Sequence, residues 1–222
     1  MSYEPGKKYH VILADIPWSY TDKKKEGRTK CGAENHYDCM TIEELEKLPV
    51  SELAEDNCVL FMWVTFPTLL DSKDPWLSPP GRVMKAWGFK YKTIGFNWIK
   101  INKDESVWHG VGSYAKSNSE VCLMGVRGKV GRLVKDKITG FAIPTDPKEK
   151  LSVVSNHVSS VVLARKGAHS SKPPIVRDKI VQLFGDVSRI ELFARDSVLG
   201  WDAIGKELNG LRVEDAGKGA NA

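Results

Sequence analysis

The sequence predicts an α/β fold, with a mostly parallel sheet covered by helices on both faces. Two short apolar runs, at 9–14 and 58–64, are typical of buried strands. Between them, Thr41-Ile42-Glu43-Glu44 forms a capping box, which predicts a helix from Ile42 to about Leu48 that stops before Pro49. Strands that alternate with helices indicate parallel pairing, because parallel neighbours need a long crossover connection.

The rest of the chain continues this alternation. The further elements that we expect are a loop at 75–81, a helix at 83–87, strands at 90–100, 120–126 and 159–164, a helix at 174–184 and a strand at 189–193. The end of the chain from Gly210 is rich in glycine, alanine and charged residues, which predicts a disordered tail. We therefore expect one domain at residues 1–209 and a tail at 210–222.

Composition supports a single core and excludes a membrane protein. The chain has 222 residues, of which 41% are hydrophobic, enough to fill one core. No apolar run approaches the length of a membrane span, and residues 1–8 are polar, so we expect a cytoplasmic protein without a membrane partner. The cysteines and histidines do not combine into zinc-ligand spacing, so no metal is expected.

Asp15-Ile16-Pro17-Trp18 follows the first strand directly. Ligands of open α/β sheets bind at the carboxyl ends of the strands, so these residues would face a site. A carboxylate, a main-chain carbonyl and an aromatic ring suit a flat heteroaromatic ring with an exocyclic amino group. The lone pair of the amino nitrogen is delocalised into such a ring. Hydrogen-bond acceptors for the two N–H groups would localise that lone pair on nitrogen. The alternative is a turn that only closes the strand, with Trp18 buried.

Five blocks in the same order give the chain a resemblance to a known family. They are Asp15 to Trp18; His36-Tyr37 before Met40-Thr41; 59–64; 97–100 with 118–128; and 169–207, which contains His169-Ser170-Ser171-Lys172-Pro173. With these blocks the chain resembles the N6-adenine methyltransferases related to the catalytic subunit of the messenger-RNA adenosine methyltransferase, whose signature is Asp-Pro-Pro-Trp. Ile16 replaces the first proline, but Pro17 still favours an extended backbone at Ile16.

The resemblance implies a single-domain, Rossmann-like, S-adenosylmethionine-dependent methyltransferase with a circularly permuted motif order. Asp15 and the Ile16 carbonyl would orient the N6 amine of adenine, Pro17 would stiffen the turn, and Trp18 would stack on the base. The residues that the resemblance assigns to S-adenosylmethionine are Lys172, Phe193, Arg195, Asp196, Ser197, Lys206 and Glu207, the last two in place of the amides usual in the family. Those assigned to the substrate are His36, Tyr37, Trp63 and Trp98, with ordinary packing as the alternative for each.

Two basic groups predict contacts with nucleic-acid phosphates. The first, Lys23, Lys24, Lys25, Arg28 and Lys30, follows the Asp15 turn, and the second lies at 127–137. The net charge of +5 is modest, so their expected position beside the pocket matters more than their number. Two solvated loops are the alternative.

The substrate has several candidates. The compact chain resembles stand-alone bacterial or phage members of the family, which favours DNA over RNA and a bacterial or phage-infected cell. One rival is a catalytically inactive, nucleic-acid-binding partner subunit of the same fold, although such partners typically lose the acidic motif. A small-molecule methyltransferase is the second rival. A homodimer is possible, and the sequence leaves it undetermined.

Overall fold

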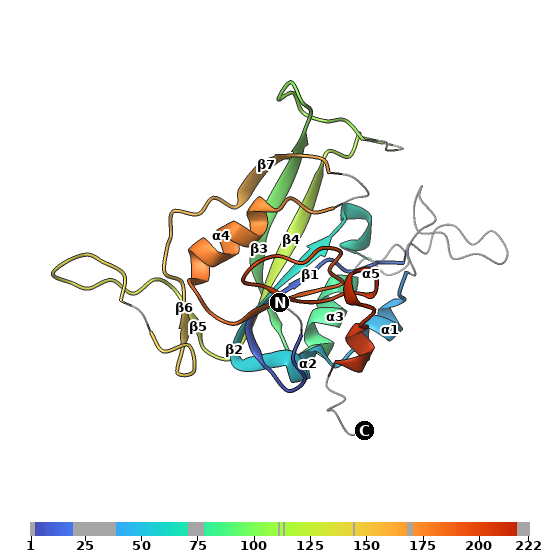
Figure 1. Cartoon of the computed structure of the whole chain (residues 1–222). Helices are drawn as coiled ribbons and strands as arrows, with labels where there is room; N and C mark the ends of the chain where they lie inside the picture. Colours follow the sequence, from blue (N-terminus) through green and yellow to red (C-terminus); the bar gives the residue numbers. More distant parts are fainter. Residues whose placement is uncertain are drawn as a thin grey trace.

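The structure is a computed structural model that describes residues 3–19, 39–70, 78–110, 112, 114–143, 145–167 and 171–216. A seven-stranded sheet has the order β7-β3-β4-β2-β1-β8-β9 (Figure 1). Its strands are β1 (Tyr9–Ala14), β2 (Ala54–Val64), β3 (Lys90–Ile101), β4 (Ser119–Arg127), β7 (Val161–Arg165), β8 (Arg189–Leu192) and β9 (Asp202–Ile204). A separate two-stranded sheet joins β5 (Val130–Gly131) to β6 (Leu151–Ser152).

The predicted mostly parallel sheet is confirmed. β1 runs parallel to both β2 and β8, β8 runs parallel to β9, and β3 runs parallel to β7. β4 is the exception, because it runs antiparallel to both β2 and β3. The carboxyl ends of β1, β2, β3 and β8 therefore share one edge of the sheet with the amino end of β4.

Helices cover both faces of this sheet, as predicted. Alternate residues of β1 point to opposite faces, so Ile12 packs in one core cluster and Leu13 in the other. The helices α1 (Ile42–Glu46) and α3 (Pro79–Ala86) contribute to the first cluster, and α4 (Ile175–Phe184) contributes to the second. The shorter helices are α2 (Val50–Leu53), α5 (Lys206–Asn209) and the 3₁₀ turns η2 (Phe66–Thr68) and η4 (Val213–Asp215).

Two helix boundaries differ from the sequence prediction. The capping box of α1 is present, because Thr41 Oγ1 accepts from the Glu44 N–H at 3.2 Å, but α1 ends at Glu46 and α2 begins at Val50. The helix α3 begins at Pro79, within the loop predicted at 75–81. Its cap is Ser78, and proline is tolerated in the first turn because the N–H groups there have no partner within the helix.

Part of the segment expected to form a disordered tail from Gly210 packs against the core. η4 packs onto the first core cluster, where Val213 is 4% exposed and Ala216 is 2% exposed. Residues 210–216 are therefore part of the fold, and residues 217–222 lie outside the described part. Within the described residues, no helix is long and apolar enough to cross a membrane.

Candidate active site

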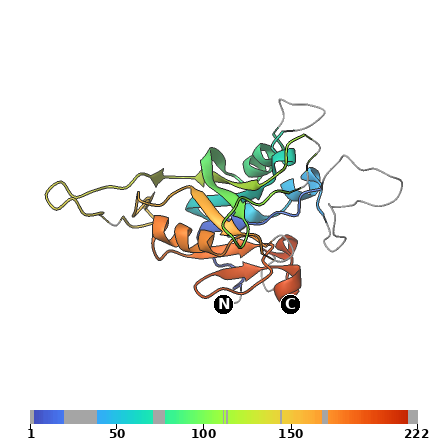
Figure 2. The ribbon, with the colours of Figure 1, turned by 90° about the horizontal axis from the view of Figure 1, so that it is seen from above.

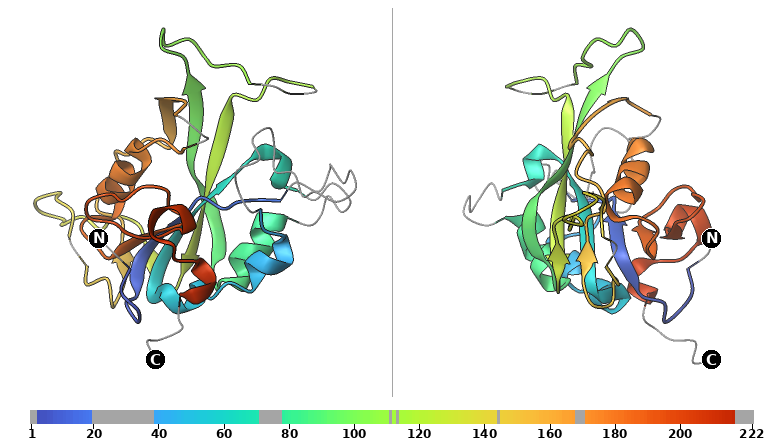
Figure 3. Two further views of the ribbon diagram at one scale, coloured as in Figure 1. Left: turned by 45° about the vertical axis from the view of Figure 1, so that its right-hand side comes forward. Right: turned by 90° about the vertical axis from the view of Figure 1, so that its left-hand side faces the viewer.

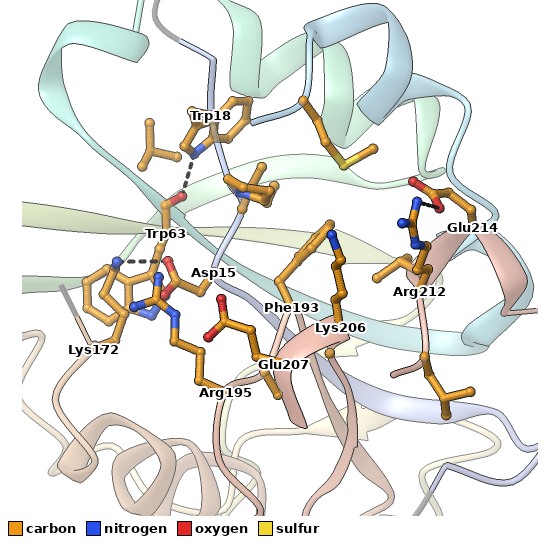
Figure 4. A pocket seen from close by; sticks show the side chains of 18 of the residues that line it. Asp15, Trp18, Trp63, Lys172, Phe193, Arg195, Lys206, Glu207, Arg212 and Glu214 are labelled. Carbon is orange, nitrogen blue, oxygen red and sulfur yellow. Dashed lines mark hydrogen bonds and ion pairs between the residues drawn. The ribbon is translucent and has the colours of Figure 1, made fainter. Parts of the chain in front are cut away.

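A pocket of about 490 Å³ opens at the edge of the sheet where β1, β2 and β8 end (Figure 4). Its walls come from five segments of the sequence: the turn at 15–18, residues 63–65 at the end of β2, and the segments 193–195, 205–207 and 211–214. Met40, Glu120 and Lys172 complete the lining. This is the position at which open α/β sheets bind ligands, and the volume suits a small-molecule site, which typically measures ~300–1,000 Å³.

The turn that carries Asp15 is held by main-chain hydrogen bonds to Met40. The Met40 N–H donates to the Pro17 carbonyl at 2.9 Å, and the Ser19 N–H donates to the Met40 carbonyl at 3.1 Å. The Trp18 N–H donates to the Ile16 carbonyl at 3.0 Å, which leaves that carbonyl one further lone pair. The backbone of the predicted motif is therefore fixed before any ligand arrives.

Asp15 belongs to a row of alternating charges. Lys172 Nζ lies 2.7 Å from Asp15 Oδ1 and 3.4 Å from Glu120 Oε2, and Lys100 Nζ lies 2.6 Å from Glu120 Oε1. Burial would raise the pKa of Glu120, but the two ammonium groups outweigh it and hold that pKa below its ordinary value. Burial would lower the pKa of Lys172, but Asp15 and Glu120 raise it above its ordinary value. Both Glu120 and Lys172 are therefore charged at neutral pH.

Glu120 is a pocket residue that the sequence analysis did not single out. It is 8% exposed and lies near the start of β4, in the apolar run 120–124. A glutamate in a strand that is otherwise apolar indicates a buried carboxylate with a charged partner, because glutamate is rarely buried unless it is paired. This pattern could have identified Glu120 from the sequence. Its partners, Lys100 and Lys172, come from distant parts of the chain, so their meeting requires the tertiary structure.

The three tryptophans assigned to the site have different positions. Trp18 lines the pocket but is 5% exposed, and its Nε1–H donates to the Trp63 carbonyl at 2.9 Å. Trp63 also lines the pocket and is 2% exposed. Trp98 is completely buried and does not line the pocket, so its assignment to the substrate is wrong in this structure. Its ring packs edge-on behind Trp63, with 6.3 Å between ring centroids.

Most residues assigned to the methyl donor line the opposite wall of the pocket. Figure 4 shows Arg195 and Glu207 extending toward Asp15 and Lys172, and Lys206 beside Phe193. Phe193 has a φ of +59°, in the left-handed region that glycine adopts most easily, so the chain makes a sharp turn there without glycine.

The segment 205–207 is placed by a close backbone approach. A Cβ atom at Gly205 would lie 1.8 Å from the Ala194 carbonyl oxygen, so only glycine fits. Asp196 and Ser197, the remaining two residues assigned to the donor, are exposed and do not line the pocket, so the structure does not bring them together with Arg195 at its wall.

Comparison with known proteins identifies the family. The MT-A70 family model matches residues 9–207, which is most of the chain. The chain belongs to the MT-A70 family. Both the resemblance found in the sequence and the methyltransferase class that it predicted are confirmed by this match.

MT-A70 relatives occur in bacteria and in plants. A type II methyltransferase of a Mycoplasma species, M.MunI, is 32% identical over 95% of this chain and 82% of that protein. A probable N(6)-adenosine-methyltransferase MT-A70-like protein of Oryza sativa is 24% identical over 94% of this chain but 24% of that protein. The N6-adenosine-methyltransferase non-catalytic subunit MTB of Arabidopsis thaliana is 29% identical over 64% of this chain and 17% of that protein. The chain thus spans most of the bacterial relative and a quarter or less of these two plant relatives.

The basic groups of this MT-A70 chain do not both flank the pocket. The second group begins at Arg127, which pairs with Cys58 in the first half of β2, whereas the pocket lies where β2 ends. The antiparallel direction of β4 causes this separation, so the expected position of the second group is wrong. Figure 2 shows the segment after β5 projecting away from the sheet. The first group, Lys23, Lys24, Lys25, Arg28 and Lys30, lies outside the described residues, as do His36 and Tyr37.

Proposed function

We propose that this MT-A70 protein transfers the methyl group of S-adenosylmethionine to the N6 amine of adenine in nucleic acid, with DNA favoured. The single observation that carries the proposal is the position of Asp15. Asp15 directly follows β1, and its carboxylate faces one pocket together with Lys172 and the wall formed by 193–195 and 205–207. One cavity thus holds an acceptor for an amine and a set of charged groups for a second ligand.

Asp15 and the Ile16 carbonyl would hold the two N–H bonds of the amine. This arrangement would direct the nitrogen lone pair toward the methyl group. S-adenosylmethionine supplies that methyl group already activated, because it is bound to a positively charged sulfonium. As the N–C bond forms, the C–S bond breaks and its electron pair stays on sulfur. The nitrogen would then release one proton, through its hydrogen bond to the Asp15 carboxylate, to water. The Asp15 carboxylate stabilises the positive charge that develops on nitrogen, which is where fixed electrostatic groups contribute most to catalysis.

The residues of the opposite wall fit the charged donor. S-adenosylmethionine carries a carboxylate, an ammonium group and ribose hydroxyls, and the wall offers Arg195, Lys206 and Glu207. We assign Arg195 to the donor carboxylate and Glu207 to the hydroxyls or the ammonium group. Lys172 lies on the Asp15 side of the pocket, so it would act between the donor and the base.

DNA is favoured over RNA by the greater similarity to the type II methyltransferase. Its identity is 32% over 95% of this chain, against 24% over 94% for the adenosine-methyltransferase-like protein of rice. The similarity to a non-catalytic subunit keeps an inactive partner subunit as the second candidate. The retained carboxylate of Asp15 and its ion pair with Lys172 support an active enzyme.

The test is methyl transfer from labelled S-adenosylmethionine to defined DNA and RNA, single-stranded and duplex, followed by mass spectrometry of the nucleosides. We expect N6-methyladenine in DNA. Asp15→Asn should lower the turnover number by about 10²–10³, the range for loss of one electrostatic group at a reacting centre, and should keep donor affinity. Asp178→Asn is the control, because this exposed carboxylate on α4 does not line the pocket. Normal turnover in Asp15→Asn would overturn the assignment.

A further inference from the structure

A row of aromatic rings and lysines leads from the pocket to the outer edge of the sheet. Lys172 Nζ lies 5.8 Å from the centroid of the Trp63 ring, and Trp63 contacts Trp98 edge-on. Lys100 Nζ lies 5.0 Å from the Trp98 ring and 5.4 Å from the Trp108 ring. Lys100 is also the ion-pair partner of Glu120, a pocket residue. Trp108 is therefore separated from the pocket lining by one lysine side chain.

Trp108 lies in the connection between β3 and β4, which extends beyond the sheet (Figure 3). Its N–H donates to the Lys100 carbonyl at 2.8 Å. A Cβ atom at Gly110 would lie 2.7 Å from the Trp108 ring and 2.3 Å from the Ser117 carbonyl oxygen, so the ring needs glycine beside it. Trp108 is half-buried, so this packing fixes the ring while part of it remains accessible.

The segment after β7 joins this connection from the other side. Arg165 Nη2 donates to the Lys103 carbonyl at 2.9 Å, and Lys166 Nζ lies 5.1 Å from the Trp108 ring centroid. We call Lys103, Trp108, Tyr114, Lys116, Arg165 and Lys166 the hairpin surface. It brings together residues that are about 60 positions apart in the sequence, as the Lys103–Arg165 contact shows.

The hairpin surface is positive and carries an exposed aromatic ring. Its four cationic side chains are exposed, and Tyr114 is fully exposed at 105%. The opposing carboxylates of the connection are Asp104 and Glu105, at its turn. Asp104 Oδ1 accepts from the Ser106 N–H and hydroxyl, so it serves the turn itself. The hairpin surface carries four cationic side chains and the connection carries two carboxylates, so positive charge is in excess.

We propose that the hairpin surface binds the nucleic-acid strand that flanks the target adenine. Bases would stack on Trp108 and Tyr114, and the four cations would contact phosphates. Aromatic platforms bordered by positive charge bind single strands without sequence readout, because every base has a face that can stack. This proposal rests on the proposed function. It assigns the phosphate contacts to the hairpin surface and not to the distant basic group at 127–137.

The test compares three variants for binding to a labelled single-stranded DNA oligonucleotide at several salt concentrations. Lys103→Ala combined with Lys166→Ala should weaken binding and flatten the log–log salt dependence by about 0.7 for each phosphate that a lysine no longer neutralises. Tyr114→Ala should weaken binding about 5- to 150-fold if a base stacks on it. Lys135→Ala combined with Lys137→Ala removes the same charge from the other end of the sheet and should change neither quantity.

Kinetics separate the failure of this proposal from the failure of the proposed function. In the first two variants, the KM for the oligonucleotide should rise, while donor affinity by calorimetry and kcat at saturating oligonucleotide stay at wild-type values. Wild-type salt dependence in the Lys103–Lys166 variant would overturn the hairpin proposal, provided that the wild type methylates DNA. A wild type that methylates neither DNA nor RNA would overturn the proposed function. Unchanged binding with a changed sedimentation coefficient would show that the hairpin surface is a protein interface, which also overturns the proposal.

Discussion

At the scale of single residues, the carboxylate of Glu120 links the side chains around the Asp15 turn to those of the outer strands. It contacts Lys172, which holds Asp15, and Lys100, which lies against Trp98 and Trp108. A buried charge is tolerated only when it is paired, so each member of this row depends on its neighbour. The arrangement fixes Lys172 between two carboxylates and so positions the side chain that we propose to act between base and donor.

Glu120→Gln tests this row through its pH dependence. We expect the free energy of unfolding to fall by about 1.5–3 kcal/mol at neutral pH, the range for hydrogen bonds to charged groups. The pKa of Glu120 is held below its ordinary value of 4.5, so the ionised carboxylate stabilises the fold above that value, and this contribution is lost as the pH falls through the folded-state pKa. The difference between wild type and variant should therefore shrink in acid.

Denaturant unfolding at a series of pH values measures this difference. Glu52→Gln, on the exposed side of α2, removes a carboxylate without a described partner in the core and serves as the control. A difference that persists unchanged into strong acid would contradict the ion-pair assignment of Glu120.

At the scale of elements, a buried ion pair joins α4 to β8, the strand that leads to the pocket wall at 193–195. Arg177 Nε and Nη2 lie 2.6 Å and 2.9 Å from the two oxygens of Glu191, which is 6% exposed. Burial raises the pKa of Glu191 and outweighs the lowering by Arg177. Although the ion pair is bidentate, its attraction does not fully offset the cost of removing the Glu191 carboxylate from water. We therefore expect this pair to determine how the helix packs on the strand more than it adds stability.

Arg177→Met should destabilise the protein by about 3–5 kcal/mol, because it leaves the Glu191 carboxylate buried without its partner. The double variant Arg177→Met, Glu191→Leu should recover most of that loss, since it removes the unpaired charge as well. Chemical denaturation of the two variants and the wild type gives both values. A double variant that is as unstable as the single one would show that the two residues contribute independently of each other.

At the scale of the whole molecule, the C-terminal segment closes the pocket. Residues 211–214 line it, while Val213 and Ala216 pack in the core cluster that α1 and α3 share. The last described residues thus belong to both the core and the site. Donor binding and global stability should respond together when this segment is removed.

A chain that ends at Gly210 should lose about 1.5–3 kcal/mol of stability, the value of burying one valine side chain, and should bind S-adenosylmethionine more weakly. A chain that ends at Ala216 is the control and should keep both properties, because every described contact is retained. Thermal unfolding and calorimetry with the donor measure the two effects. If the chain ending at Gly210 behaved as wild type, the segment would be dispensable for both core and pocket.

Much of the fold was determined by the sequence alone. Hydrophobic periodicity located β1, β2, β4, α4 and β8, because a strand or helix that buries apolar residues must repeat them at its own period. The turn chemistry at Asp15 located the pocket, since strand ends of an open sheet meet at one edge. The ordered motif blocks identified the MT-A70 family.

Only the tertiary structure decided the direction of β4 and the partners of its buried carboxylate. Strand direction depends on pairing between segments far apart in the chain, which local pattern does not encode. The antiparallel course of β4 brings Glu120 to the pocket and carries Arg127 to the far end of the sheet. The same long-range packing buries Trp98 behind Trp63 and brings Val213 into the core, because side-chain burial is determined by which surfaces meet in space.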